Sequence, residues 1–224
     1  MAFLSLFNAM NDRKIKSKQF KSIIALVTKY NVLNSIKAEG YGSTTNKIQA
    51  IYKKMAKKFN EETLDTSSLN HFIKKQLDTV KPGLESIKQS AKVFDKGDKI
   101  KGSKDLKARD LAKYILVTLE IERIRLDDKN TANKALKYVY DLSIEHIVDR
   151  KNHNELGDIV YDLGNLVLLE NTEHSNSTDK KSMYENSNVN LIKVLRDNIE
   201  NFEEKNITER HDKLLEEFYN IVTK

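Results

Sequence analysis

Three of the five histidines lie close together in the chain, at His146, His153 and His174. Hydrolysis of a phosphodiester requires a general base that takes a proton from water, and an imidazole has a pKa near neutrality. It also commonly uses a divalent metal ion, which neutralises charge on the phosphate and on the leaving oxygen. The region 146–174 is therefore a candidate for this chemistry, whereas His153 and His211 themselves are expected to be loop and helix-surface residues.

The residues around these histidines show the alternation of a β-hairpin. Apolar side chains recur at every second position over 141–148 and again over 163–169, and the polar segment 149–158 joins the two stretches. The sequence Asn171-Thr172-Glu173-His174 is typical of a capped helix start. We therefore predict an antiparallel hairpin followed by a helix that begins near Thr172. This arrangement can bring a base from the first strand close to metal ligands from that strand and from the first turn of the helix.

The order of the residues in this region resembles a known nuclease signature. His146, Asn165 and His174 follow one another at offsets of 19 and 9 residues, as in the HNH (His-Me finger, ββα-metal) endonucleases. Glu-His-Ile at 145–147, followed by Leu-Gly-Asn-Leu-x-Leu-Leu-Glu at 163–170, resembles the C-terminal nuclease domain of GmrSD-type modification-dependent restriction systems. The resemblance is strong over 140–176. It is weaker in the helix 114–120 and in the element Ile-x-x-Arg-x-x-x-Leu at 207–214.

The resemblance implies a role for each residue of the signature. His146 would be the general base, and Asn165 would hold the loop of the base or orient its ring. Glu145 and His174 would be the protein ligands of Mg²⁺, or of Mn²⁺, with water and phosphate oxygens completing the shell. The alternatives are a core histidine at 146, a turn residue at 165 and a helix-start residue at 174.

Two features of the sequence depart from the signature. Relatives carry proline shortly after Glu-His-Ile, where this chain has Asp149. Glu145 and His146 are also adjacent, and neighbouring residues of a strand point to opposite faces. We therefore expect the first strand to end or to bulge at this position.

The charge of the chain is concentrated near its N-terminus. Residues 1–59 carry 12 lysines and arginines against two acidic residues, a net charge of +10, whereas the whole chain carries +6. Such a basic segment favours a polyanion such as DNA as partner, although lysine-rich helices can also be merely well solvated. The candidate phosphate contacts are Lys53, Lys54, Lys57 and Lys58 on a helix near 48–59, together with Lys180, Lys181 and Arg210.

Composition indicates a mainly α fold. The 224 residues include one proline, seven glycines and no cysteine, which excludes disulfides and cysteine-ligated zinc. We expect a basic helical region at 1–137 and an HNH-type region at 138–224, packed as one unit. No segment is long and apolar enough for a membrane span or a signal peptide, so a cytoplasmic protein of a prokaryote or phage is expected.

The function that follows is a metal-dependent DNA endonuclease or nickase, acting in restriction, antiviral defence or mobile-element conflict. A Gly-rich phosphate loop is not found. The chain is therefore expected to be a fragment, a standalone nuclease, or one subunit whose partner is a separate nucleotide-handling or sensor subunit. The alternatives are an inactive nucleic-acid-binding module of the same fold, a nuclease that acts on RNA, and an interaction protein of a larger complex.

Overall fold

The computed structural model describes residues 2–36, 41–62, 65, 67–90, 108–127, 138–170, 180–196 and 202–223. The chain divides into two compact units, an N-terminal unit of Met1–Ser90 and a C-terminal unit of Ala91–Lys224. The helix over 108–127 is expected from the sequence in the basic region, but in the structure it belongs to the C-terminal unit, because it packs on the hairpin and on the last helix.

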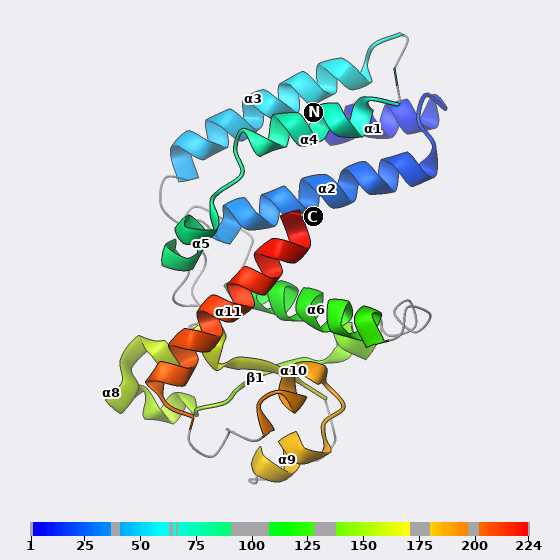
Figure 1. Ribbon diagram of the computed structural model, residues 1–224. Helices are drawn as coiled ribbons and strands as arrows, with labels where there is room; N and C mark the ends of the chain where they lie inside the picture. The colour runs from blue at the N-terminus through cyan, green and yellow to red at the C-terminus, as the bar shows by residue number, and fades with distance from the viewer. Residues whose placement is uncertain are drawn as a thin grey trace. The chain divides into compact units, whose positions relative to one another are not determined.

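The N-terminal unit is a group of helices (Figure 1). They are α1 (Ala2–Asn11), α2 (Ser17–Ile36), α3 (Tyr41–Phe59), α4 (Leu69–Asp78) and α5 (Leu84–Ser90). In α3, Ile51, Met55 and Phe59 recur at helical spacing and are buried in the core of this unit. Their burial leaves the lysines of α3 on the remaining faces of the helix.

The C-terminal unit contains a two-stranded antiparallel sheet, made of β1 (Ser143–His146) and β2 (Leu166–Leu169). The expected mainly α fold with an embedded hairpin is therefore confirmed. Short helical turns connect the strands: η1 (Arg150–Asn152), α8 (His153–Leu156), η2 (Gly157–Tyr161) and η3 (Leu163–Asn165). The longer helices of the unit are α6 (Ala108–Asp127) and α11 (Glu204–Thr223), and the shorter ones are α9 (Lys180–Asn186) and α10 (Asn190–Lys193).

Both strands are shorter than the alternation predicts. The register pairs Ser143 with Leu169 and His146 with Leu166, and the last ladder bond runs from the Ile147 amide to the Asn165 carbonyl at 2.9 Å. Residues 163–165 form a 3-10 turn instead of strand, because the Asp162 side chain accepts a hydrogen bond from the Gly164 amide at 2.7 Å. The expected helix start near Thr172 lies outside the described residues.

Helices α6 and α11 pack together in the C-terminal unit, and Figure 1 shows them on the opposite side of the hairpin from α9. The rings of Tyr114 and Phe218 meet edge to face, with centroids 6.2 Å apart, and Arg123 forms an ion pair with Glu217 at 2.9 Å. Glu120 of α6 accepts hydrogen bonds from the first amides of α10, at Asn190 and Leu191. Burial raises the pKa of Glu120, and these two hydrogen bonds oppose the rise.

Among the described residues, no helix combines the length and the apolar composition that crossing a membrane requires.

Candidate active site

The candidate base lies at the end of β1. His146 is 6% exposed, and its ring meets the ring of Tyr161 edge to face, with centroids 6.3 Å apart. Glu145, the preceding residue, is exposed and lies on the other face of the strand. Burial raises the pKa of the Tyr184 phenol, and the Glu145 carboxylate adds to this rise. The strand ends at His146 without a bulge, so the two side chains diverge.

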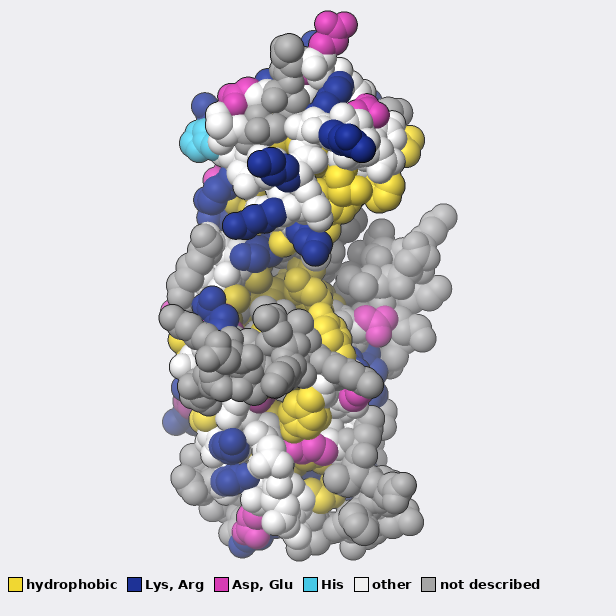
Figure 2. All heavy atoms as spheres, turned by 90° about the vertical axis from the view of Figure 1, so that its right-hand side faces the viewer, with side chains coloured by type: hydrophobic (Ala, Val, Ile, Leu, Met, Phe, Trp, Pro, Cys, Tyr) yellow, Lys and Arg dark blue, Asp and Glu magenta, His cyan; other side chains and the backbone are white. Residues whose placement is uncertain are grey.

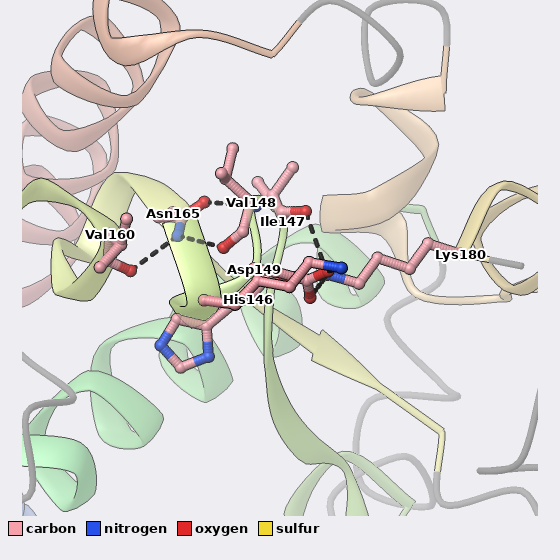
Figure 3. A network of polar contacts seen from close by, with 8 residues as sticks. His146, Ile147, Val148, Asp149, Val160, Asn165 and Lys180 are labelled. Carbon is pink, nitrogen blue, oxygen red and sulfur yellow. Dashed lines mark hydrogen bonds and ion pairs between the residues drawn. The ribbon is translucent and has the colours of Figure 1, made fainter. Parts of the chain in front are cut away.

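Asn165 holds the backbone that follows the candidate base. Its side chain is fully buried, and its Oδ1 accepts the Val148 amide at 2.8 Å. Its Nδ2 donates to the carbonyl of Val148 at 2.9 Å and to that of Val160 at 2.7 Å. Figure 3 shows this amide between the two valines. The three hydrogen bonds connect the residues after β1 to the turns that lead into β2. They can therefore hold the loop that follows the candidate base.

Lys180 approaches the same turn from α9 (Figure 3). Its Nζ donates to the carbonyls of His146 and Ile147, at 3.0 and 3.3 Å, and forms an ion pair with Asp149. The hydrogen bond from Lys180 lowers the pKa of the Asp149 carboxyl, against a smaller opposing effect of burial. Lys180 therefore contacts the turn that carries the candidate base.

Helix α11 holds the η3 turn from the other side. Gly164 lies so close to α11 that a Cβ atom there would be 1.9 Å from the Ile207 carbonyl oxygen. His211 Nδ1 lies 2.7 Å from Asp162 Oδ1, and both side chains are buried. His211 is thus a core residue, and the expectation of a helix-surface histidine is wrong, because it packs towards the turn that Asp162 caps.

Arg210 also binds this turn. Its Nη1 donates to the carbonyls of Gly164 and Leu166, at 2.7 and 2.9 Å, and more weakly to that of Leu163 at 3.4 Å. Burial lowers the pKa of the guanidinium to about 10, so that the group is charged at neutral pH. In this structure Arg210 holds backbone carbonyls in the interior of the C-terminal unit.

The other predicted phosphate contacts lie on the surface. Lys53, Lys54 and Lys57 of α3 and Lys181 of α9 are exposed, and Lys58 is partly exposed with an ion pair to Glu61 at 2.6 Å. Figure 2 shows one face of the protein, on which lysine and arginine side chains gather over the N-terminal unit. The structure therefore leaves the lysines of α3 accessible, but in a different unit from His146.

The predicted metal ligands are only partly described. The carboxylate of Glu145 is exposed, whereas His174 lies outside the described residues. In the part of the chain that the structure describes, no three His, Cys, Asp or Glu side chains are grouped to hold a metal ion. The Glu145 carboxylate is an oxygen donor of the kind that Mg²⁺ prefers.

The C-terminal unit is mainly α with one embedded β-hairpin, and His146 lies at the end of the first strand. This arrangement is consistent with an HNH-like nuclease domain. The family model described as "GmrSD restriction endonucleases, C-terminal domain" matches residues 88–217. Because this match covers more than half of the chain, the chain belongs to that family, and its C-terminal unit is a restriction-type nuclease domain. No curated protein and no solved structure shows significant similarity.

Two residues of this region have contacts that the sequence does not predict. Asp162 caps η3 and binds His211, and Asp149 binds Lys180. The sequence does not single out Asp162, and it marks Asp149 only as a departure from the nuclease signature. The signal for Asp162 was available, because an Asp two residues before a Gly-Asn pair is typical of a side-chain cap on a turn. Nothing local predicts the partner of Asp149, because Lys180 is 31 residues away in the chain.

Proposed function

We propose that this protein is a metal-dependent endonuclease or nickase of the HNH type, which hydrolyses DNA with His146 as the general base. The observation that carries the proposal is the double hydrogen bond between Asn165 and Val148, since it holds the chain directly after His146. Membership of a restriction-endonuclease family supplies the reaction class. A role in restriction or antiviral defence, with a separate nucleotide-handling or sensor subunit, belongs to the same proposal.

The chemistry is that of water attacking a phosphodiester. His146 takes one proton from water while the water oxygen bonds to phosphorus, and the bond from phosphorus to one sugar oxygen breaks. Asn165 keeps the backbone of the base in place during this step. A bound Mg²⁺ or Mn²⁺ would neutralise charge on the phosphate, and Glu145 and His174 are the side chains proposed to hold it.

The test of the base compares wild type with His146→Ala on supercoiled plasmid, with Mg²⁺, Mn²⁺ or EDTA. General-base catalysis contributes about 10²–10⁴-fold in rate, so cleavage by the variant should fall by that factor while DNA affinity stays close to wild type. His71→Ala is the control, because His71 is an exposed histidine of α4 outside the matched family segment. A His146→Ala protein that cuts as fast as wild type would exclude this base.

The metal is tested separately by calorimetry. Mg²⁺ or Mn²⁺ binding should be lost in the Glu145→Ala, His174→Ala double variant and retained in Glu155→Ala, which removes another exposed carboxylate of the same unit. Unchanged binding in the double variant would rule out this pair of ligands.

An inactive nucleic-acid-binding module is the second candidate, and the burial of His146 favours it. A side chain that is 6% exposed offers little surface to water or phosphate. If wild type binds nucleic acid but cleaves neither DNA nor RNA with any of the metals, this function is the better description.

A further inference from the structure

The ammonium group of Lys180 is bound to protein oxygens, whereas a lysine that binds phosphate needs a free N–H donor. An ammonium group carries three N–H donors and no acceptor. Among the described residues, the Nζ of Lys180 contacts three protein oxygens: the carbonyls of His146 and Ile147, at 3.0 and 3.3 Å, and the carboxylate of Asp149. These oxygens use all three donors, so none is left for a phosphate.

The three oxygens belong to one short turn. Residues 146–149 leave the sheet directly after the last ladder bond, which ends at Ile147. The carbonyls of His146 and Ile147 would otherwise depend on water, whereas a charged donor binds such oxygens more strongly than a neutral one. The Asp149 carboxylate receives Lys180 on Oδ1 and Lys151 on Oδ2, the latter at 3.4 Å. Lys180 thereby fixes both ends of the turn.

Asn165 and Lys180 bind this turn from opposite sides, as Figure 3 shows. Asn165 binds Val148, in the middle of the turn, and Lys180 binds the residues before and after it. Loss of either side chain would leave the turn held from one side only. A displacement of about 1 Å in a catalytic group can cost on the order of a hundredfold in rate.

We propose that Lys180 is a positioning residue, which holds the 146–149 turn so that His146 keeps its place at the end of β1. The proposal rests on the proposed function of His146. Lys180 contacts backbone, not substrate, and acts through the residue that it positions. Lys180 is the first residue of α9 and lies six residues after His174 in the chain. Its contacts therefore join the start of α9 to the strand that carries the base.

The first test separates positioning from phosphate binding. Lys180→Met removes the ammonium and keeps the aliphatic stem, and Lys205→Met removes the same charge from an exposed position on α11, outside the predicted phosphate contacts. At saturating DNA, the single-turnover cleavage rate of Lys180→Met should fall roughly 10–100-fold, as for residues that orient catalytic groups, while its DNA Kd stays within about twofold of that of Lys205→Met and of wild type. An unchanged cleavage rate with a raised DNA Kd would identify a phosphate contact and overturn the proposal. The slope of the logarithm of the binding constant against the logarithm of the salt concentration would then also fall by about one.

Chemical rescue separates positioning from a general loss of folding. The chain has no cysteine, so Lys180→Cys introduces a single thiol. Alkylation with 2-bromoethylamine restores an ammonium at nearly the length of lysine and should restore cleavage, whereas iodoacetamide adds a neutral amide and should not. Equal activity of the two alkylated proteins would overturn the proposal.

Amide hydrogen exchange gives a readout that does not need cleavage. The Val148 amide, bonded to Asn165 Oδ1, should exchange at least about tenfold faster in Lys180→Met than in Lys205→Met. Unchanged exchange at Ile147 and Val148 would show that Lys180 does not hold the turn. If this exchange responds but wild type cleaves nothing, the positioning contact stands and the proposed nuclease function fails.

Discussion

The side-chain amide of Asn165 joins two segments that are far apart in the sequence. It is buried and satisfies both the amide and the carbonyl of Val148, and the carbonyl of Val160. Only an amide side chain can donate and accept in this pattern, because a carboxylate has no donor and a hydroxyl has a single proton. The residue type at 165 is therefore set by the turn after His146.

Asn165→Ala should destabilise the C-terminal unit by about 2–4 kcal/mol, because it leaves three backbone groups without their partner. Asn165→Asp should be at least as damaging, since its carboxylate would face two carbonyl oxygens. Urea unfolding measures both effects, with the exposed Asn188→Ala as control. A stable Asn165→Asp protein would mean that these hydrogen bonds contribute little.

The Asp149 carboxyl provides a pH-dependent probe of the same turn. Its pKa lies below the ordinary value of 3.8 because Lys180 donates a hydrogen bond to the charged form. For an acid whose pKa is depressed on folding, the stabilisation is present above the unfolded pKa and is lost as the pH falls through the folded pKa. The contact is therefore intact at neutral pH and is lost only below about pH 4.

Lys180→Met should move the pKa of Asp149 up towards 3.8, and carboxyl carbon NMR titration measures it directly. Lys151→Met should have a smaller effect, because Lys151 is more exposed and its contact is longer. If the titration of Asp149 were the same with and without Lys180, the ion pair would be absent in solution.

At the scale of the elements, contact between η3 and α11 sets the position of Asn165. Gly164 has no side chain to separate the two, and Asp162 and Arg210 add polar contacts on either side of it. Helix α11 is amphipathic, with Ile207, Leu214 and Phe218 buried. The turn is therefore held by a helix that is distant in sequence.

Gly164→Ala should destabilise the C-terminal unit by about 1–3 kcal/mol, because the new Cβ meets the backbone oxygen of Ile207 and the helix must move. The cleavage rate should fall as well, because Asn165, which holds the backbone after His146, is the next residue in the chain. Gly83→Ala is the matched control, because a Cβ there meets nothing within 4 Å. If the two units unfold in separate transitions, only that of the C-terminal unit should shift.

The elements that could be predicted from the sequence are those with a strong local pattern. Apolar alternation around Ile144 and Val167 predicts β1 and β2, and the stripe of Ile51, Met55 and Phe59 predicts α3. The strand ends are not predictable in this way, because Gly164 leaves the strand conformation for its contact with α11. The contacts of Arg210, Lys180 and His211 are not predictable either, because their partners lie 31 to 49 residues away in the chain.

At the scale of the whole molecule, charge is divided unequally between the two units. The N-terminal unit carries 16 lysines and arginines against seven acidic residues, and the C-terminal unit carries 23 against 26. The matched family segment begins at residue 88, so the basic unit lies almost entirely outside it. This division fits the proposal that the basic N-terminal unit binds the nucleic acid that the nuclease domain acts on.

Charge reversal at Lys53, Lys54, Lys57 and Lys58 should therefore weaken DNA binding on all sequences alike and flatten its dependence on salt. Filter binding or fluorescence anisotropy at several salt concentrations measures both quantities. The control reverses Lys193, Lys205 and Lys213, which are exposed lysines of the C-terminal unit. Equal losses in the two variants would mean that the basic unit has no special part in binding.

The position of α11 in the chain has a consequence for synthesis. Ile207, whose carbonyl packs against Gly164, is translated 43 residues after it, and Arg210 and His211 follow. Domains begin to fold as they leave the ribosome, from the N-terminal side. A nascent chain that has emerged only as far as Arg196 can pair β1 with β2 but lacks the helix that holds η3. The turn that carries Asn165 is therefore completed only after α11 has emerged from the ribosome.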